Sequence, residues 1–468
     1  MAFTSHIFLF YFLPLVLLIY YLIPKGRNQF LLAAGYVFYA WFQPWFAFLL
    51  LAATVIGYAG GTAITRSADE NRKHKVFIAA LCANLALLGF FKYFTFLQTN
   101  LYSLLGLCGF HPGPVWDIPL PVGISFFTFL SISYLVSMYI GDAPPARSFS
   151  DFACYISLFP MVTAGPITRY PLIAEALRSR EHTIDKFASG AALFILGFAK
   201  KILLADPMGT VANAVFGAEA PGTIDAWFGL LAYAFQIYFD FAGYSEMAVG
   251  LGRMVGFELI RNFNAPYRAD SITDFWRRWH ISLSTMLRDY VYVPLIAVGR
   301  NRSTKYIIYR NLILTFLICG LWHGAAWTFI LWGGYHGLFL AFEQWRGKKG
   351  RYARLSRPVK IGLTFVAILL SWVLFRSPTL GDAGRYYLTL FGGHGASGGS
   401  ILLAGIIYTQ GNFLLMALCA ALVFQPYQAF EWAERITPWK AVWLIALFAF
   451  SILGMFAQTF SPFLYSQF

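Results

Sequence analysis

Two histidines lie in a stretch of 32 residues, Asn311–Phe342, that contains no Asp, Glu, Lys or Arg. His323 belongs to the run GLWHGAAW and His336 to the run GGYHG. An ionisable side chain in a membrane segment is costly, so both residues are candidates for function. On one straight helix, the 13 positions between them would correspond to about 20 Å. The two could then not act on one atom, so we expect one chemical and one structural histidine.

The residues around His323 make it the better candidate for chemistry. Gly320 and Gly324 flank it, which allows a substrate or another backbone to approach closely. Trp322 and Trp327 could form the walls of a pocket. A neutral imidazole can serve as a general base near neutral pH, so His323 is the predicted base. The alternative is a core histidine that is hydrogen-bonded to a neighbouring helix.

The remaining candidates are a thiol and a carboxylate. Cys319 lies one helical turn before His323, where nucleophile and base could meet, although a cysteine in an apolar helix usually serves for packing. Asp240, in the run IYFDFAGYSEMA, could orient a histidine, bind an acceptor hydroxyl or pair with an arginine. The five cysteines form no C-x-x-C pair, so neither a metal site nor a disulfide framework is expected. Phosphate-binding loop motifs are also absent, which argues against an ATP-driven function.

A charged and aromatic segment precedes the histidine block. Between Arg253 and Arg310 there are ten Lys or Arg and four acids, mixed with Trp, Tyr and Phe. The run TDFWRRWHISLSTMLRDYVYVPL is too charged to span a membrane and too aromatic for a solvated loop. On one helix, Trp276 and His280 would share a face. We expect a helix at the cytoplasmic interface or inside the protein; the alternative is an amphipathic anchor whose basic side chains reach the lipid headgroups.

The composition indicates what positions these residues. Of the 468 residues, 59% are hydrophobic and 12% are charged, against about 25% charged in a soluble domain. The chain is therefore predicted to be an all-α, polytopic membrane protein. Its net charge of +14 is attributed to basic cytoplasmic loops rather than to nucleic-acid binding, because no hydrophilic domain is present.

Stretches without charge predict about 11 or 12 membrane segments, some of them broken or re-entrant. We treat residues 1–468 as one integral membrane domain. The predicted segments are Ile7–Ile23, Asn28–Thr65 as a hairpin broken near Gln43 and Pro44, Val76–Phe91 with Lys92, Ile118–Gly141, Phe152–Thr168 as a broken segment, two spans centred on 187–204 and 226–245, Asn311–Phe342, Ile361–Phe375, part of Tyr386–Phe430, and Ala441–Phe460.

The basic loops predict the orientation. Glu343–Lys360 holds seven Lys or Arg and one acid, and Arg66–Lys75 is also basic, so both are expected on the cytoplasmic side. Both chain termini are then expected outside. Ile7–Ile23 is interpreted as a first transmembrane helix rather than a cleaved signal. The run Gly392–Ser400 is interpreted as a flexible linker on the outer side.

The run from Asn262 to His336 resembles the core of the membrane-bound O-acyltransferase (MBOAT) family, in the branch of bacterial alginate O-acetyltransferases. The similar motifs are NFNAPYRADSITDFWRRWHISLSTMLRDYVYVPL (262–295), GLWHGAAWTFILWGGYHG (320–337), LPVGISFFTF (120–129), FPMVTAGPITRY (159–170) and FQIYFDFAGYSEMAVGLGRMVGF (235–257). The resemblance covers nearly the whole chain, with its motif core at 235–342.

The resemblance implies a fold and a site. The family fold is a helical shell around a tunnel that is thinned at its centre, with an acyl donor entering from the cytoplasmic side and an acceptor from the other. The family's catalytic histidine, in the W-H-G motif, falls on His323. The residues expected to line or support the tunnel are His280, Asp240, Trp322 and Trp279. The residues expected to form the donor mouth are Asp274, Trp276, Arg277 and Arg278. No metal and no bound cofactor are expected.

The resemblance also implies an activity. The chain is expected to move acetyl from acetyl-CoA across the bacterial inner membrane for O-acetylation of an exported polysaccharide such as alginate. A periplasmic acetyltransferase partner is expected to complete the transfer, and membrane lipid surrounds the chain. The alternative from another class is a transporter or lipid-linked sugar carrier without covalent chemistry. Transporters often have paired halves, and the sequence shows no internal repeat.

Overall fold

The computed structural model describes residues 1–110, 113–298, 304–347, 351–393, 400–458 and 463–464. Helices and helical turns within these ranges, with η for π or 3₁₀ turns, follow in chain order. The first half contains η1 Phe8–Phe12, α1 Leu13–Leu22, α2 Arg27–Ala40, α3 Phe46–Arg66, α4 Glu70–Leu107, α5 Ile124–Ile140, α6 Phe149–Ser157, α7 Tyr170–Arg178, α8 Ile184–Ala199, η2 Lys200–Ala205, α9 Asp206–Phe216 and α10 Thr223–Met254. The second half contains η3 Pro266–Arg268, α11 Ile272–Arg278, α12 Ile281–Leu287, η4 Arg288–Tyr292, α13 Val293–Val298, α14 Thr304–His323, α15 Trp327–Arg346, η6 Arg351–Arg354, α16 Arg357–Arg376, α17 Leu380–Leu390, α18 Ile401–Ile407, α19 Gln410–Phe424, α20 Ala429–Ala433 and α21 Pro438–Ala457.

Six helices in the described part of the chain are long and apolar enough to cross a membrane: α3, α4, the continuous unit α8–η2–α9, α14, α16 and α21. The bent pair α18 and α19, which meet at 52°, makes a seventh if it is counted as one span. The chain is therefore an all-α, polytopic membrane protein, as predicted. The apolar helices Phe8–Leu22 and α5 are shorter, so some of the predicted segments do not have the length of a complete crossing.

The predicted breaks in the first third of the chain are confirmed. The hairpin α2–α3 turns at residues 41–45, around Pro44. The predicted segment Phe152–Thr168 contains α6 and then an irregular stretch whose residues 158–162 are all buried. Non-helical backbone at membrane depth is tolerated where protein surrounds it, so this burial fits a broken segment.

One predicted span is shorter than expected. Ile118–Gly141 becomes helical only at Ile124, after Gly123 adopts a left-handed conformation with φ of 77°. A Cβ atom at Gly123 would lie 2.3 Å from the carbonyl oxygen of Val162. The glycine therefore lets the extended segment that precedes α5 contact the irregular segment of the previous paragraph.

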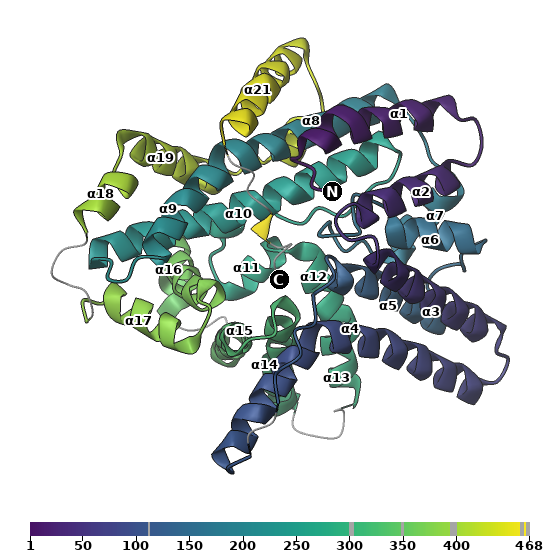
Figure 1. Ribbon diagram of the computed structural model, residues 1–468, viewed down its shortest axis with the longest axis horizontal. Helices are drawn as coiled ribbons and strands as arrows, with labels where there is room; N and C mark the ends of the chain where they lie inside the picture. The colour runs from purple at the N-terminus through teal and green to yellow at the C-terminus, as the bar shows by residue number, and fades with distance from the viewer. Residues whose placement is uncertain (111–112, 299–303, 348–350, 394–399, 459–462, 465–468) are drawn as a thin grey trace.

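The long helix α10 crosses the middle of the molecule, with α8 and α9 along one side (Figure 1). Most of its 32 residues are buried on all faces, as expected for a helix inside a large protein. The hairpin α14–α15 and the helices α16 and α17 lie on the opposite side from α8, and α18, α19 and α21 lie at the periphery (Figure 1). The short helices α11 and α12 lie near the centre of the same view.

One single-helix expectation is wrong. The segment around Trp276 and His280 is two helices, α11 and α12, because His280 has a left-handed backbone with φ of 44°. The chain at Asn262 stabilises this break, since its carbonyl accepts from the N–H of Ile281 and its side chain from that of Ser282. The uncharged block Asn311–Phe342 is likewise divided into α14 and α15.

Two predicted features fall partly on residues outside the described ranges. Of the predicted linker Gly392–Ser400, residues 394–399 lie outside them, as do residues 348–350 of the basic loop Glu343–Lys360. The orientation of these segments stays a prediction.

Candidate active site

The hairpin α14–α15 positions both histidines of the uncharged block. His323 is the last residue of α14, and His336 lies in the middle of α15. The helices pack closely because Gly320 has no side chain: a Cβ atom there would lie 2.1 Å from the carbonyl oxygen of Phe329. Both imidazoles contact the indole of Trp332, with ring centroids at 5.0 Å and 4.9 Å. The two imidazoles therefore pack against one shared contact, the indole of Trp332, because they lie on two packed helices and not along one straight helix.

Aromatic rings surround His323, which is 1% exposed. The ring centroids of Trp322, Trp332 and Phe375 lie 4.9, 5.0 and 5.2 Å from that of the imidazole. The predicted wall residue Trp327 is not among them, because it is 52% exposed and its Nε1–H donates to Asn100. The sequence interpretation missed Trp332, which only the turn between α14 and α15 brings to this position.

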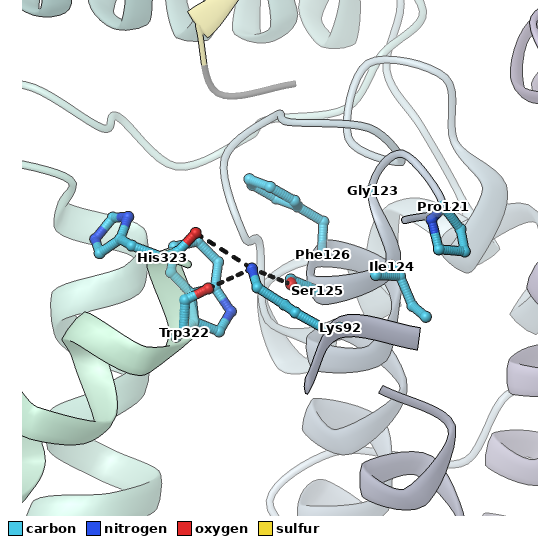
Figure 2. Close-up of a pocket in the computed structure, with 8 residues that line it drawn as sticks. All are labelled: Lys92, Pro121, Gly123, Ile124, Ser125, Phe126, Trp322 and His323. Carbon is cyan, nitrogen blue, oxygen red and sulfur yellow. Dashed lines mark hydrogen bonds between the residues drawn. The ribbon is translucent and has the colours of Figure 1, made fainter. Parts of the chain in front are cut away.

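The space beside His323 is small. Its volume is about 10 Å³, on the order of one water molecule. Figure 2 shows the backbone carbonyl of His323 directed at Lys92 of α4, whereas the imidazole lies on the side away from it. A larger cavity of about 370 Å³ lies on the other side of the non-helical segment 120–123. Pro121 and Gly123 line the small space, and Leu120 and Val122 line the larger cavity. The predicted tunnel would have to join such spaces, and it stays a prediction.

His280 lies beside His323, with ring centroids 6.4 Å apart, and beside Trp322 at 5.9 Å. Its Nδ1 is 3.2 Å from the side-chain oxygen of Asn262. A carbonyl oxygen can only accept, so Nδ1 carries a proton in this contact. The break between α11 and α12 therefore places an oriented imidazole next to the predicted base.

His336 is held at both ring nitrogens. The Nε1–H of Trp276 donates to Nδ1 at 3.3 Å, and Nε2 lies 3.2 Å from the hydroxyl of Ser371. Because Nδ1 accepts, the proton is on Nε2 and is donated to Ser371. These contacts assign His336 to holding α11, α15 and α16 together.

The predicted donor-mouth residues lie on α11 but not on one surface. Arg277 is exposed, whereas Trp276 is buried against His336. Arg278 binds Asp274 at 2.8 Å and reaches the backbone of the preceding loop at 3.3 Å. The carboxylate of Glu343, which lies in the last turn of α15 and not in a loop, accepts from the first N–H groups of α11. Helix α11 thus begins beside the end of α15 and ends at the buried Trp279 and His280.

Comparison with known proteins decides the family. The family description MBOAT, membrane-bound O-acyltransferase family, matches residues 145–356. The chain is 41% identical to the probable alginate O-acetylase AlgI of Azotobacter vinelandii and 39% identical to that of Pseudomonas aeruginosa, with both chains covered completely in each case. It is 32% identical to the peptidoglycan O-acetyltransferase of Helicobacter pylori, over all of this chain and 98% of the other. This chain belongs to the MBOAT family. It is therefore a membrane-bound acyltransferase.

Two further candidate residues of this MBOAT protein, Asp240 and Cys319, make contacts typical of structural residues. The carboxylate of Asp240 lies 2.7 Å from the ammonium of Lys201, which also binds Asp206 at 2.6 Å. The other oxygen of Asp240 accepts from the N–H of Leu464 at 2.9 Å. Its charged partner is therefore a lysine of η2. Cys319 is fully buried on α14, which agrees with packing.

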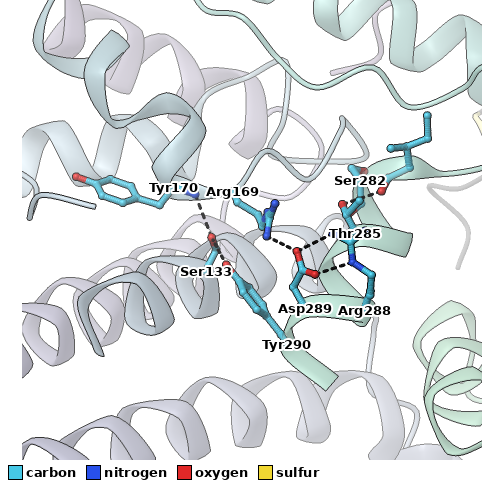
Figure 3. Close-up of polar contacts among 9 residues, drawn as sticks. Ser133, Arg169, Tyr170, Ser282, Thr285, Arg288, Asp289 and Tyr290 are labelled. Atoms are coloured by element: carbon cyan, nitrogen blue, oxygen red, sulfur yellow. Dashed lines mark hydrogen bonds and ion pairs between the residues drawn. The ribbon is translucent and has the colours of Figure 1, made fainter. Parts of the chain in front are cut away.

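A polar network near α12 joins two of the motif segments, 159–170 and 262–295, to each other and to helix α5. Figure 3 shows Asp289 between Arg169 and Arg288, at 2.7 Å from each. Partial burial acts to raise the pKa of Asp289, but its contacts with Arg288 and then Arg169 outweigh this and hold the pKa below its ordinary value. In the same view the hydroxyl of Ser133 contacts both the hydroxyl of Tyr290 and the backbone N–H that begins α7. The sequence interpretation missed this network, although opposite charges in two quoted motifs were a usable signal.

Proposed function

We propose that this MBOAT protein is an O-acetyltransferase that takes acetyl from acetyl-CoA on the cytoplasmic side of the bacterial inner membrane. The acetyl group would pass through the membrane for O-acetylation of an exported polysaccharide such as alginate, with a periplasmic acetyltransferase as partner. Support for the acetyl group and the polysaccharide comes from the full-length similarity to proteins named alginate O-acetylases.

The observation that carries the proposal is the imidazole of His323, buried among aromatic rings at the end of α14. In acetyl transfer an acceptor hydroxyl attacks the thioester carbonyl, the imidazole takes the hydroxyl proton, and the thiol leaves with a proton. Such a base contributes about 10²–10⁴-fold to the rate. The test is acetyl content of the exported polymer in cells with His323→Ala, measured together with the amount of protein in the membrane.

The position of α11 supports a donor entrance on the side of the basic loop. Its first turn binds Glu343, and its last residues approach the buried Trp279 and His280. Arg277 is exposed on this helix, and CoA is a polyanion. A positive charge at an entrance raises the local concentration of such a substrate.

Arg277→Gln is expected to raise the apparent KM for acetyl-CoA by about three- to tenfold, with kcat changed less, because it removes long-range attraction. The effect should shrink at high ionic strength. The measurement is the initial rate of CoA release by membranes that contain the protein, against acetyl-CoA concentration. Arg278→Gln is the contrasting variant, since it breaks the contact with Asp274 and should lower kcat as well. If Arg277→Gln leaves the KM for acetyl-CoA unchanged, the result contradicts a role in donor binding and favours the alternative that Arg277 anchors the segment to lipid headgroups.

The proposed orientation places both termini in the periplasm. Met1 and Phe463 line the same cavity, which supports the placement of both chain termini on one side of the membrane. Reporter fusions at Lys73 and Lys349 are expected to read cytoplasmic, and fusions at His394 and Phe468 periplasmic, because Lys and Arg are retained inside. Lys349, His394 and Phe468 lie outside the described residues. Alkaline phosphatase activity paired with green fluorescence measures the side, and a cytoplasmic Phe468 fusion would contradict the orientation.

A further inference from the structure

Lys92 is a buried cation in an apolar helix. It is the only Asp, Glu, Lys or Arg from Val76 to Leu107, and its side chain lies within the protein with 8% of the residue exposed. A buried ammonium is costly unless polar groups satisfy it. Within the described part of the chain its hydrogen bonds go to neutral oxygens. The contacts of Lys92 should therefore explain why a cation occupies this buried position.

What Lys92 binds is the end of the helix that carries the predicted base. Its Nζ donates to the carbonyl oxygens of Trp322 at 2.5 Å and His323 at 3.4 Å, and to the hydroxyl of Ser125 at 3.2 Å (Figure 2). The last carbonyls of a helix have no N–H partner in the helix and carry a partial negative charge. The ammonium supplies both the missing donors and the opposite charge.

The neighbouring residue of α4 contacts the same helix end. The hydroxyl of Tyr93 donates to the carbonyl of Leu321 at 3.0 Å. Farther along α4, Asn100 accepts from the indole N–H of Trp327, at the start of α15. Helix α4 thus contacts the turn between α14 and α15 at several points, and among these described contacts it is Lys92 that binds the carbonyl of His323.

The side chain and the backbone of His323 point to different neighbours. Figure 2 shows its carbonyl directed at Lys92 and its imidazole on the other side of the helix end. The ammonium therefore contacts the backbone and not the ring in this view. Fixing the carbonyl of a terminal helical residue fixes the direction in which its side chain leaves the backbone.

We propose that Lys92 is a positioning residue for His323: its ammonium binds the last two carbonyls of α14 and so fixes the imidazole where acyl transfer requires it. The inference rests on the proposed role of His323. Lys92 lies outside the matched residues 145–356, so the positioning contact comes from the part of the chain before the family match. A misplacement of about 1 Å can cost on the order of 10²-fold in rate, while ground-state binding of substrates is less affected.

Lys92→Met tests this, because methionine fills a similar volume without charge or donors. The kcat for acetylation is expected to fall by about 10- to 100-fold, with the KM for acetyl-CoA within about twofold of wild type. Tyr93→Phe is the matched control: it removes one hydrogen bond to the same helix end from the adjacent residue, and it should keep at least about a third of kcat. Both are measured in membranes at equal protein content.

Several outcomes would overturn the inference. One is a wild-type kcat in Lys92→Met while His323→Ala is inactive, which leaves the proposed function standing. A second is an equal loss in Tyr93→Phe, since packing of α4 would then explain both. A third is a raised KM at unchanged kcat, which would make Lys92 a substrate ligand. An active His323→Ala would instead remove the proposed function itself. If Lys92→Met does not accumulate, Lys92→Gln is measured in the same way, and a wild-type kcat there also overturns the role of the ammonium.

Discussion

In cells that carry His323→Ala, the exported polymer is expected to lack O-acetyl groups, while the variant protein still accumulates in the membrane. The acceptor hydroxyl has a pKa far above 7, so it needs a base as it attacks the thioester. Loss of that base is expected to cost about 10²–10⁴-fold in rate. Acetyl on the polymer and the amount of membrane protein must be measured together. Truncating a buried polar side chain can also destabilise the fold by about 1–3 kcal/mol.

Cys319→Ser is the control for His323→Ala, because the thiol is fully buried one turn earlier on the same helix. It should keep most of the activity. If it is inactive and an acetyl-protein adduct disappears with it, acetyl passes through the thiol. If His323→Ala acetylates at a near-normal rate, this histidine belongs to the core and the site assignment is wrong.

Features that depend on neighbouring residues could be predicted from the sequence. Charge-free stretches located α3, α4, α14 and α16, because the absence of charge over about 20 residues is itself the requirement for crossing a membrane. The turn near Pro44 and the irregular backbone after α6 followed from proline and glycine within apolar runs.

Features that depend on distant residues could not be predicted. The break at His280 depends on hydrogen bonds from the backbone and side chain of Asn262. Helical periodicity compares only residues within one segment, so it could not reveal these contacts. Lys92 binds the carbonyl of Trp322, which lies 230 positions later in the sequence. The aromatic rings that contact His323 include that of Trp332 and not that of Trp327, because the turn between α14 and α15 reverses the chain. In each case the deciding contact is tertiary, so residue types identified the candidates but not their partners.

Gly320→Ala is expected to separate α14 from α15 and to reduce both stability and activity. The new methyl group would lie 2.1 Å from the backbone oxygen of Phe329, and a backbone atom of a packed helix cannot rotate away. Overpacking of this kind costs about 1–3 kcal/mol. Since His323 follows three residues later at the end of the same helix, we also expect at least about a tenfold loss of acetylation from its displacement.

The matched control for Gly320→Ala is Gly334→Ala, in the facing helix of the same hairpin. There the nearest atom to a new Cβ is a side-chain carbon of Leu317 at 3.4 Å, an ordinary van der Waals contact. Alanine also favours a helix over glycine by about 1 kcal/mol, so this variant should be as stable as wild type or more so. Thermal unfolding of both variants in detergent, with acetylation measured in membranes, compares them directly. Equal stability and activity of the two variants would show that the hairpin can open without moving His323, and the close contact of α14 with α15 would then not be what positions the imidazole.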